Sequence, residues 1–264
     1  MTVKDLLRGK RVLVSGSSSG IGAETSRVLT EQGASVIGVD VEERLDNIDE
    51  FYLADLSSES AINALVEILP SGIDGLVNNA GLPPTRSASK LLAVNLVGLK
   101  SLTMRLIPKL NDGGSIVNIA SLAGLGWPKS VKAIRAADGL DFHEIDDFIA
   151  RWNVSNEGGR SYSFTKEALI VWTMQNRWTW RDRGIRMNSV SPGLVNTPLL
   201  GDFLETLGAR AEEEARAMNC LGEVKDIAPV VAFLLSDLAT WIRGANIVAD
   251  GGMSSNILCE MYGL

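Results

Sequence analysis

The sequence predicts an α/β protein: one doubly wound parallel sheet with helices on both of its faces. Along the chain, short runs of aliphatic and β-branched residues alternate with longer stretches whose apolar residues recur at helical spacing. The first apolar run, residues 12–14, passes through a glycine-rich turn into a helical pattern that begins at Ile21. Strands that alternate with helices favour a parallel sheet, because parallel strands need a crossover that is usually a helix. The sequence shows no internal repeat and no linker, so residues 1–264 are expected to form a single domain.

Strands are expected where short apolar runs end at turn residues: 12–14, 34–40, 51–55, 75–81, 115–121, 185–190 and 246–248. Helices are expected over residues 21–32, 58–69, 88–110, 162–181, 205–218 and 224–235. Gly33 is a good stop for the first helix, and Ser57 or Ser58 can cap the second. A further amphipathic candidate covers residues 138–152, where apolar side chains such as Phe148 face one way and acidic side chains the other.

Size and composition limit the kinds of function. With 264 residues, of which 45% are hydrophobic and 22% charged, the chain is long enough for a substantial core. A net charge of -7 argues against a nucleic-acid partner, which would require a basic face. No apolar run reaches the roughly 20 residues of a membrane span, and residues 1–10 show no signal peptide. We therefore expect a cytoplasmic protein that does not bind a membrane.

The glycine-rich turn predicts a dinucleotide site. Gly16 can make the tight turn after the strand, Gly20 lets the backbone approach a pyrophosphate, and Gly22 lets the helix pack closely on the sheet. The N-terminus of that helix offers free N–H groups to a phosphate. The second predicted strand ends at Asp40, about 20 residues further on, where a carboxylate would accept hydrogen bonds from a ribose 2′-OH. A plain strand–helix–strand unit without a ligand is the simpler alternative.

The single histidine, His143, argues against two other kinds of site. The turn Gly16-x-Ser18-x-Gly20 also matches the nucleophile elbow of a hydrolase. A Ser–His–acid triad needs a histidine, however, and His143 lies in an acidic stretch where a solvated surface histidine is the simpler interpretation. With one histidine and two distant cysteines, the chain also lacks the ligands of the usual zinc sites, and no metal is predicted.

Tyr162 and Lys166 form a candidate proton-transfer pair. Four residues apart, they lie on the same face of a predicted helix. A phenol with a pKa near 10 is a poor base at neutral pH, but a nearby ammonium would lower that pKa. Ser121 ends a predicted strand, at the edge where open α/β sheets bind ligands, so its hydroxyl could hold a substrate oxygen beside the phenol. In isolation, a Tyr and a Lys at this spacing also occur on ordinary helices.

With these motifs, the chain resembles the short-chain dehydrogenase/reductase family over nearly its whole length. The resemblance rests on the order of these motifs: Gly16-x-x-x-Gly20-x-Gly22, Asp55-Leu56, Asn78-Asn79-Ala80-Gly81, Asn95, Ser121, Tyr162-x-x-x-Lys166 and Pro192-Gly193-x-x-x-Thr197. It implies a Rossmann-type fold and an NAD cofactor. It also implies a homo-oligomer, a dimer or tetramer.

The resemblance also implies roles for these residues. Tyr162 would be the general acid–base, Ser121 would orient the substrate oxygen, Lys166 would hold the nicotinamide ribose, and Asn95 would fix a water in a proton relay. The implied cofactor-binding residues are Gly16, Ser18, Ser19, Gly20, Ile21, Gly22, Asp40, Asp55, Leu56, Asn79, Ala80, Gly81, Tyr162, Lys166, Pro192, Gly193, Val195 and Thr197. Alternatives remain for the asparagines: Asn78 and Asn79 could only bond neighbouring backbone, and a buried Asn95 could make a simple core bond.

Residues 122–160 form an insertion relative to the family layout. With Glu167 and the residues that follow it, this segment is similar to the branch that contains 3α-hydroxysteroid and coniferyl-alcohol dehydrogenases. The similarity implies bulky, largely apolar alcohols or carbonyls as substrates. We expect the insertion to wall the substrate cleft or to remodel a subunit interface, with Trp127, Phe148 and Trp152 as anchors and the tail 257–264 as a second cover.

The sequence thus predicts an NAD(H)-dependent alcohol dehydrogenase or carbonyl reductase that acts on small-molecule substrates. Asp40 favours NAD(H), because a carboxylate repels a 2′-phosphate and Val41 follows it instead of a base. The alternative from another class is a non-catalytic protein that senses NAD and binds a partner. Such a sensor would not need Ser121, Tyr162, Lys166 and Asn95 together.

Overall fold

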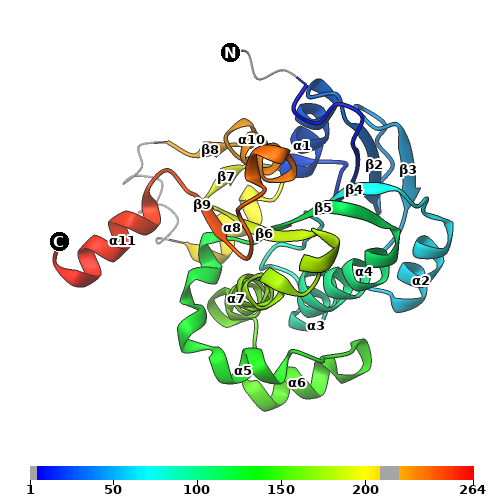
Figure 1. Ribbon diagram of the computed structural model, residues 1–264. Helices are drawn as coiled ribbons and strands as arrows, with labels where there is room; N and C mark the ends of the chain where they lie inside the picture. Colours follow the sequence, from blue (N-terminus) through cyan, green and yellow to red (C-terminus); the bar gives the residue numbers. More distant parts are fainter. Residues whose placement is uncertain (1–4, 209–219) are drawn as a thin grey trace.

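The computed structural model describes residues 5–208 and 220–264. Within these residues, seven parallel strands form one twisted sheet in the order β3-β2-β1-β4-β5-β6-β9 (Figure 1). The strands are β1 (Arg11–Ser15), β2 (Ser35–Asp40), β3 (Glu50–Leu53), β4 (Ile73–Asn78), β5 (Leu110–Ile119), β6 (Arg186–Pro192) and β9 (Asn246–Ala249). A separate parallel pair joins β7 (Val195–Asn196) to β8 (Gly222–Glu223). The predicted doubly wound parallel sheet is confirmed.

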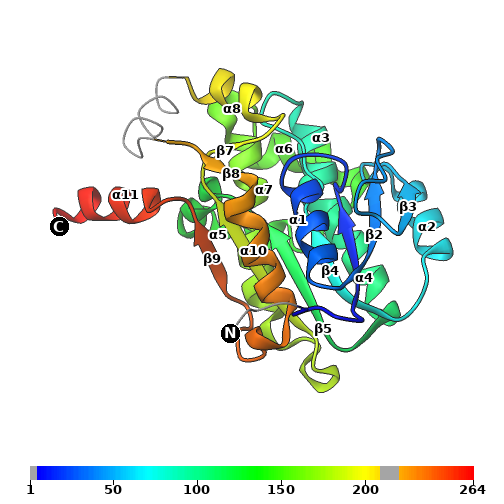
Figure 2. The same cartoon turned by 90° about the horizontal axis from the view of Figure 1, so that it is seen from above.

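Helices cover both faces of the sheet (Figures 1 and 2). On one face, α1 (Gly20–Glu31) and α10 (Val224–Leu235) bury a core that includes Val14, Val36, Val77 and Leu234. The other face is covered by α2 (Glu59–Ile68), α3 (Ala88–Leu92), α4 (Leu99–Leu106) and α7 (Arg160–Gln175). The strand order reverses between β1 and β4, which places a crevice at the carboxyl ends of these two strands.

The helix expected over residues 88–110 has a π-helical segment, Ala93–Gly98, between α3 and α4. The wider turn fits the packing at Gly98, where a Cβ would lie 2.0 Å from the carbonyl oxygen of Leu56. By length and composition, the helix Ala88–Lys109 could cross a membrane, although the sequence predicted no segment of that kind. Because most of this stretch is buried against the domain, it is the core helix of the fold.

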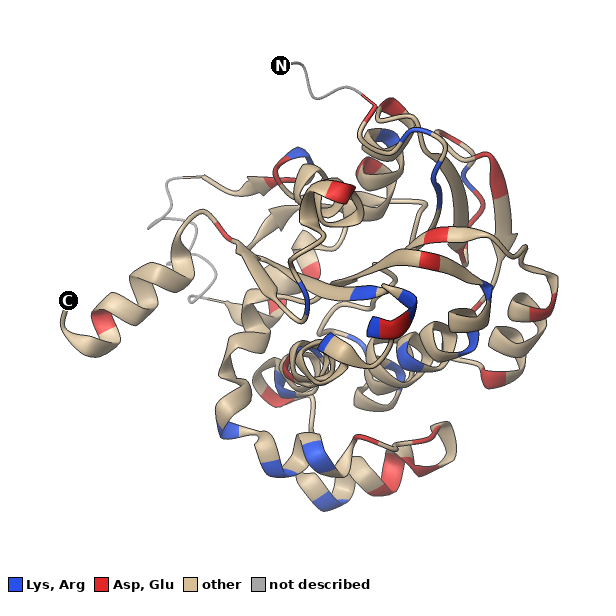
Figure 3. Ribbon diagram, in the orientation of Figure 1, with Lys and Arg blue, Asp and Glu red and all other residues tan. Residues whose placement is uncertain are grey.

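The insertion forms two short α-helices joined by 3₁₀ segments, where the sequence predicted one helix. The predicted helix 138–152 is wrong in its first half: α5 (Val131–Ala136) ends before it, and α6 begins at Ile145 and ends at Trp152. Asp141 and Glu144 form a capping box that starts a new helical turn there. Figure 3 shows basic residues on α5 and acidic residues on α6. The apolar side of α6 packs on the domain itself, and Phe148 meets Phe164 of α7 with ring centroids 5.4 Å apart.

Several other boundaries differ from the prediction. The helix that carries Tyr162 ends at Gln175, where Asn176 turns its side chain back to the carbonyl of Trp172. Strand β5 begins at Leu110, before a register shift against β4. Helix α8 covers Leu200–Leu207 and so includes only the first residues of the helix expected over 205–218; residues 209–218 of that range lie outside the described residues. Helix α11 (Met253–Tyr262), near the C-terminus, extends away from the body of the domain (Figure 2).

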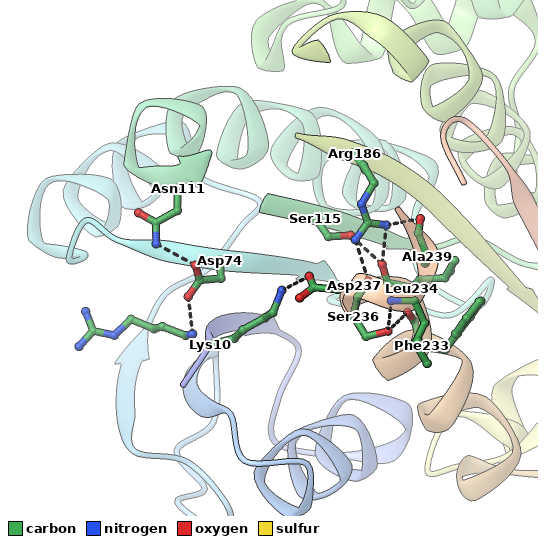
Figure 4. Close-up of polar contacts among 12 residues, drawn as sticks. Lys10, Asp74, Asn111, Ser115, Arg186, Phe233, Leu234, Ser236, Asp237 and Ala239 are labelled. Carbon is green, nitrogen blue, oxygen red and sulfur yellow. Dashed lines mark hydrogen bonds and ion pairs between the residues drawn. The ribbon is translucent and has the colours of Figure 1, made fainter. Parts of the chain in front are cut away.

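A buried arginine ties β6 to the end of α10 (Figure 4). The Arg186 guanidinium donates to the carbonyl oxygens of Leu234, Ala239 and Ser236 at 2.9, 2.9 and 3.1 Å. Burial lowers the pKa of Arg186, although the guanidinium stays charged. The carbonyls at a helix C-terminus carry partial negative charge, so they provide the partner that a buried cation needs.

Candidate active site

A cavity of about 1340 Å³ opens at the carboxyl ends of the strands. Residues that follow β1, β2, β3, β4, β5 and β6 line it, and α7, α8 and α11 complete the wall. Its position matches the crevice at the reversal of strand order, where open α/β sheets bind ligands.

The glycine turn has the geometry that a dinucleotide site requires. Gly16 and Gly20 have φ angles of +68° and +53°, in the left-handed region. A Cβ at Gly22 would lie 1.9 Å from the carbonyl oxygen of Gly16, so only glycine lets α1 start this close to β1. Ser19 precedes α1 without a side-chain cap, and the N-terminus of the helix faces the cavity. The first N–H groups of α1 are therefore available to an anion.

Asp40 lies at the end of β2 and lines the same cavity. Its carboxylate accepts from the backbone N–H of Ser18 at 2.9 Å and from that of Val41 at 2.7 Å. These bonds fix the carboxylate beside the glycine turn. The Ser18 hydroxyl in turn donates to the carbonyl of Glu42 at 2.5 Å, so Ser18 supports this turn instead of lining the cavity.

The segment after β4 forms the opposite wall. The Asn79 amide donates to the carbonyl of Gly16 at 2.8 Å and so braces the glycine turn, while Ala80 and Gly81 line the cavity. Asn78, in contrast, is buried and donates to Thr103 and to Asn118, each at 2.8 Å. The alternative of bonding to neighbouring backbone is therefore wrong for the side chain of Asn78, which bonds buried side chains. It holds for Asn79, which bonds the backbone of Gly16 and also lines the cavity.

A second wall comes from the segment after β6. Pro192, Gly193, Val195 and Thr197 all line the cavity, and a Cβ at Gly20 would lie 3.4 Å from the Thr197 side chain. Thr197 and the start of α1 therefore lie next to each other on the cavity wall.

Ser121, Tyr162 and Lys166 lie together on the cavity wall. The Lys166 ammonium donates to the carbonyl of Ile119 at 2.8 Å and lies 5.6 Å from the centroid of the Tyr162 ring. The Ser121 hydroxyl oxygen accepts from the N–H of Ala123 at 3.2 Å, which leaves its own proton for the phenol oxygen. Three of the four predicted catalytic residues thus lie together on the cavity wall.

Burial, and not the ammonium, determines the pKa of this phenol. Burial raises the pKa of Tyr162 to about 12, and the hydrogen bond from Ser121 only partly opposes the change. Burial also lowers the pKa of Lys166 to about 8. The phenol pKa is therefore raised, where the sequence predicted a lowered one. Desolvation at the foot of the cavity is the larger effect.

Asn95 does not line the cavity. It lies in the π-helical segment, fully buried, and its amide bonds both backbone groups of Leu82: it accepts from the N–H at 2.7 Å and donates to the carbonyl at 3.0 Å. Asn95 thus fixes the chain that follows Gly81. Its part in a proton relay stays a prediction.

Most of the predicted residues meet at the cavity. Those that line it are Gly16, Ser19, Gly20, Ile21, Asp40, Asp55, Leu56, Asn79, Ala80, Gly81, Ser121, Tyr162, Lys166, Pro192, Gly193, Val195 and Thr197. Ser18, Gly22 and Asn95 do not, and each supports a residue that does.

Sequence reasoning missed most of the apolar end of the cavity, although it expected the tail 257–264 to cover the site. Beyond Tyr162, the walls carry Leu82, Val94, Leu125, Leu199, Phe203 and Ile257. Phe203 of α8 packs edge-on against the Tyr162 ring. The leucine and phenylalanine spacing of α8 is amphipathic and could have indicated this wall.

Two family models match most of the chain between them. Residues 10–133 match the model described as short chain dehydrogenase, and residues 148–254 match the one described as enoyl-(acyl carrier protein) reductase. The stretch between the two matches is part of the insertion, from Ile134 of α5 to Asp147 of α6.

Curated relatives and solved structures resemble the chain over nearly its full length. A coniferyl-alcohol dehydrogenase from a Pseudomonas species is 39% identical over 94% of this chain and 98% of its own. A 3-alpha-hydroxysteroid dehydrogenase/carbonyl reductase from Comamonas testosteroni is 30% identical over 92% and 96%. The crystal structure of a 3-alpha-hydroxysteroid dehydrogenase from Pseudomonas sp. B-0831, complexed with NADH, has a TM-score of 0.79 at 27% identity and covers 94% of this chain and 98% of its own.

Proposed function

Because the chain belongs to the short-chain dehydrogenase/reductase family and is an oxidoreductase with a nicotinamide cofactor, we propose that it uses NAD(H) to interconvert a bulky, largely apolar alcohol and its carbonyl. Coniferyl-type aromatic alcohols and hydroxysteroids are the substrate classes that we propose. The observation that carries the proposal is the cavity itself, in which Ser121, Tyr162 and Lys166 lie between a dinucleotide-binding turn and an apolar chamber. The names of the relatives support both substrate classes.

The site fits the cofactor on its own geometry. The glycine turn, whose close packing of α1 on Gly16 a Cβ at Gly22 would prevent, presents the start of α1 to a pyrophosphate. At the adenosine end, Asp40, Val41, Ala54, Asp55 and Leu56 line the cavity, and none of these is a cation. A 2′-phosphate would meet the Asp40 carboxylate there, which supports NAD(H) over NADP(H).

The chain's own residues handle the proton. When bound, the nicotinamide supplies or accepts the hydride. Tyr162 gives a proton to the substrate oxygen during carbonyl reduction and removes one during alcohol oxidation, while Ser121 holds that oxygen in place. Lys166 donates one N–H to Ile119, and its other two point to no partner among the described residues, so they are available to the ribose and the phenolate.

The raised phenol pKa bears on the direction of the reaction. With a pKa of about 12 before ligands bind, Tyr162 is protonated at neutral pH and ready to act as an acid. Carbonyl reduction should therefore be fast at neutral pH, whereas alcohol oxidation should accelerate as the pH rises. The proposed homo-oligomer and the cytoplasmic location both stay predictions.

The test is absorbance near 340 nm during incubation of the protein with NAD⁺ and a panel of cinnamyl-type and steroid alcohols, and with NADH and the matching carbonyls. We expect turnover of at least one bulky apolar member and much slower turnover of ethanol. Tight NADH binding without turnover of any member would favour the alternative, a non-catalytic NAD sensor.

A further inference from the structure

An ion pair between a buried carboxylate and a partly exposed guanidinium lies on α7, beside the catalytic residues but outside the proposed chemistry. The Arg160 guanidinium donates to the Glu167 carboxylate at 2.9 Å and to the hydroxyl of Ser130 at 3.0 Å. The Glu167 side chain is 7% exposed and that of Arg160 35%. A carboxylate this deeply buried needs a charged partner, and Arg160 supplies it.

The network joins three pieces of chain that meet at the active site. Arg160 begins α7, two residues before Tyr162, and Glu167 directly follows Lys166. Seven residues apart, Arg160 and Glu167 lie two helical turns from each other on one face, roughly opposite to the face of Tyr162. Ser130 follows the 3₁₀ segment Leu122–Lys129, which starts right after Ser121.

This 3₁₀ segment lies in contact with α7. A Cβ at Gly124 would be 2.7 Å from the carbonyl oxygen of Lys166, and a Cβ at Gly126 would be 3.0 Å from a carboxylate oxygen of Glu167. The two ends of the segment are held in different ways. At its start, Ser121 follows strand β5, and at its end, the Ser130 hydroxyl accepts a hydrogen bond from Arg160. The position of the segment on α7 therefore helps to set where the Ser121 hydroxyl stands relative to the phenol.

Stability alone gives little reason for such a pair. Removing the Glu167 carboxylate and most of the Arg160 guanidinium from water costs free energy that their salt bridge barely recovers, and an apolar pair of the same shape often stabilises a protein more. What the pair supplies is geometry, because a guanidinium forms directed bonds to two partners at once. Reactions that depend on aligned groups lose rate when those groups move by about 1 Å.

We propose that Arg160 and Glu167 are positioning residues, which clamp the 3₁₀ segment after Ser121 onto the catalytic helix and so align Ser121 with Tyr162. The proposal rests on the catalytic roles given above. It assigns to the start of the insertion a function in the alignment of the catalytic groups, at a place where Arg160 and Glu167 also line the cavity.

The kinetic test uses Glu167→Gln, which keeps the shape of the side chain and removes its charge. We expect kcat, expressed per NADH-binding site, to fall at least tenfold while the Kd of NADH changes less than twofold. Expressing kcat per site removes any loss due to unfolded protein, which a merely structural role would cause. In the Glu167→Gln background, Arg160→Gln should then change kcat less than twofold, because the pair is already broken.

The matched control is Glu59→Gln, which breaks the exposed pair of Glu59 with Arg105 (3.1 Å) between α2 and α4. Its kcat per site should equal that of the wild type. The proposal is wrong if Glu167→Gln retains kcat per site within twofold of the wild type. It is also wrong if the loss of kcat in the double variant equals the product of the losses in Arg160→Gln and Glu167→Gln.

A second measurement needs no substrate. Amide hydrogen exchange over residues 122–130 should be at least tenfold faster in Glu167→Gln than in the wild type, with α10 unchanged. Unchanged exchange over 122–130 would refute the clamp. If the wild type oxidises none of the alcohols but this exchange rises, the proposed function fails and the clamp stands.

Discussion

The ring of Phe203 stands nearly perpendicular to the ring of Tyr162, with centroids 5.1 Å apart and an interplanar angle of 79°. Helix α8 thereby places an apolar side chain directly on the proposed proton donor. Thr85 bonds Asp202 of the same helix, which holds α8 against the opposite wall. The apolar chamber therefore ends at the reacting phenol.

Phe203→Ala should weaken the binding of bulky substrates. The contact is an edge-to-face pair worth about 0.5–1.5 kcal/mol beyond its buried area. We expect KM for an aromatic alcohol to rise about three- to tenfold, with the Kd of NADH unchanged. Steady-state kinetics and fluorescence titration with NADH measure the two quantities. An unchanged KM would mean that α8 does not contact the substrate.

Tyr162→Phe should abolish turnover and leave cofactor binding nearly intact. The phenol oxygen carries the proton, whereas the ring that remains still packs against Phe203. Residual kcat above about a tenth of the wild-type value, a loss below roughly 1.4 kcal/mol of barrier, would contradict the proposed role. Ser121→Ala is the companion variant and should also lose most of kcat while binding NADH normally.

Asp40→Ala, combined with Val41→Arg, should shift the cofactor preference toward NADP(H). The first change removes the carboxylate that would repel a 2′-phosphate, and the second adds a cation at an exposed position next to it. The ratio of kcat/KM for NAD⁺ to that for NADP⁺ should fall at least a hundredfold. Equal use of both cofactors by the wild type would overturn the NAD(H) proposal.

Lys166 should make the cofactor-free protein more stable at higher pH. Its pKa is about 8 in the folded chain and near the ordinary 10.5 in the unfolded chain. Between these values the unfolded chain binds more protons, so the free energy of unfolding rises with pH, by up to about 3 kcal/mol from this group. Urea unfolding at pH 8 and pH 10 should show a smaller rise in Lys166→Met than in the wild type. Equal rises in the two proteins would mean that Lys166 is not desolvated.

Arg186→Met should destabilise the fold without altering the site. It removes the three charged hydrogen bonds to the carbonyls of Leu234, Ser236 and Ala239 (Figure 4), which costs about 3 kcal/mol. These carbonyls then keep only neutral donors, from Ser115, Ala239 and Ile242 respectively. Arg243→Met is the control, because the half-buried Arg243 bonds two carbonyls at 3.1 and 3.4 Å and should cost less than about 1 kcal/mol. Urea unfolding compares them. Equal losses would mean that burial of Arg186 is not what matters.

Local patterns were enough to predict the sheet, the glycine turn, Asp40 and the Tyr162–Lys166 pair, since each depends on residues close in sequence. Features that depend on distant partners were not predicted. The π-helical turn fits Gly98 against the carbonyl of Leu56, and the edge contact on Tyr162 comes from Phe203, far along the chain. The predicted direction of the shift in the Tyr162 pKa was wrong for the same reason, because burial is a property of the folded chain and not of a four-residue spacing.

The insertion has a consequence for how the catalytic helix behaves at low concentration. Phe148 of α6 packs on Phe164 of α7, so the outer side of the helix that carries Tyr162 is covered by a segment of the same polypeptide. A contact with another subunit is lost when dilution dissociates the oligomer, whereas a contact within the same chain does not depend on concentration. The support of Tyr162 from this side is therefore independent of protein concentration, and dilution by itself does not remove it.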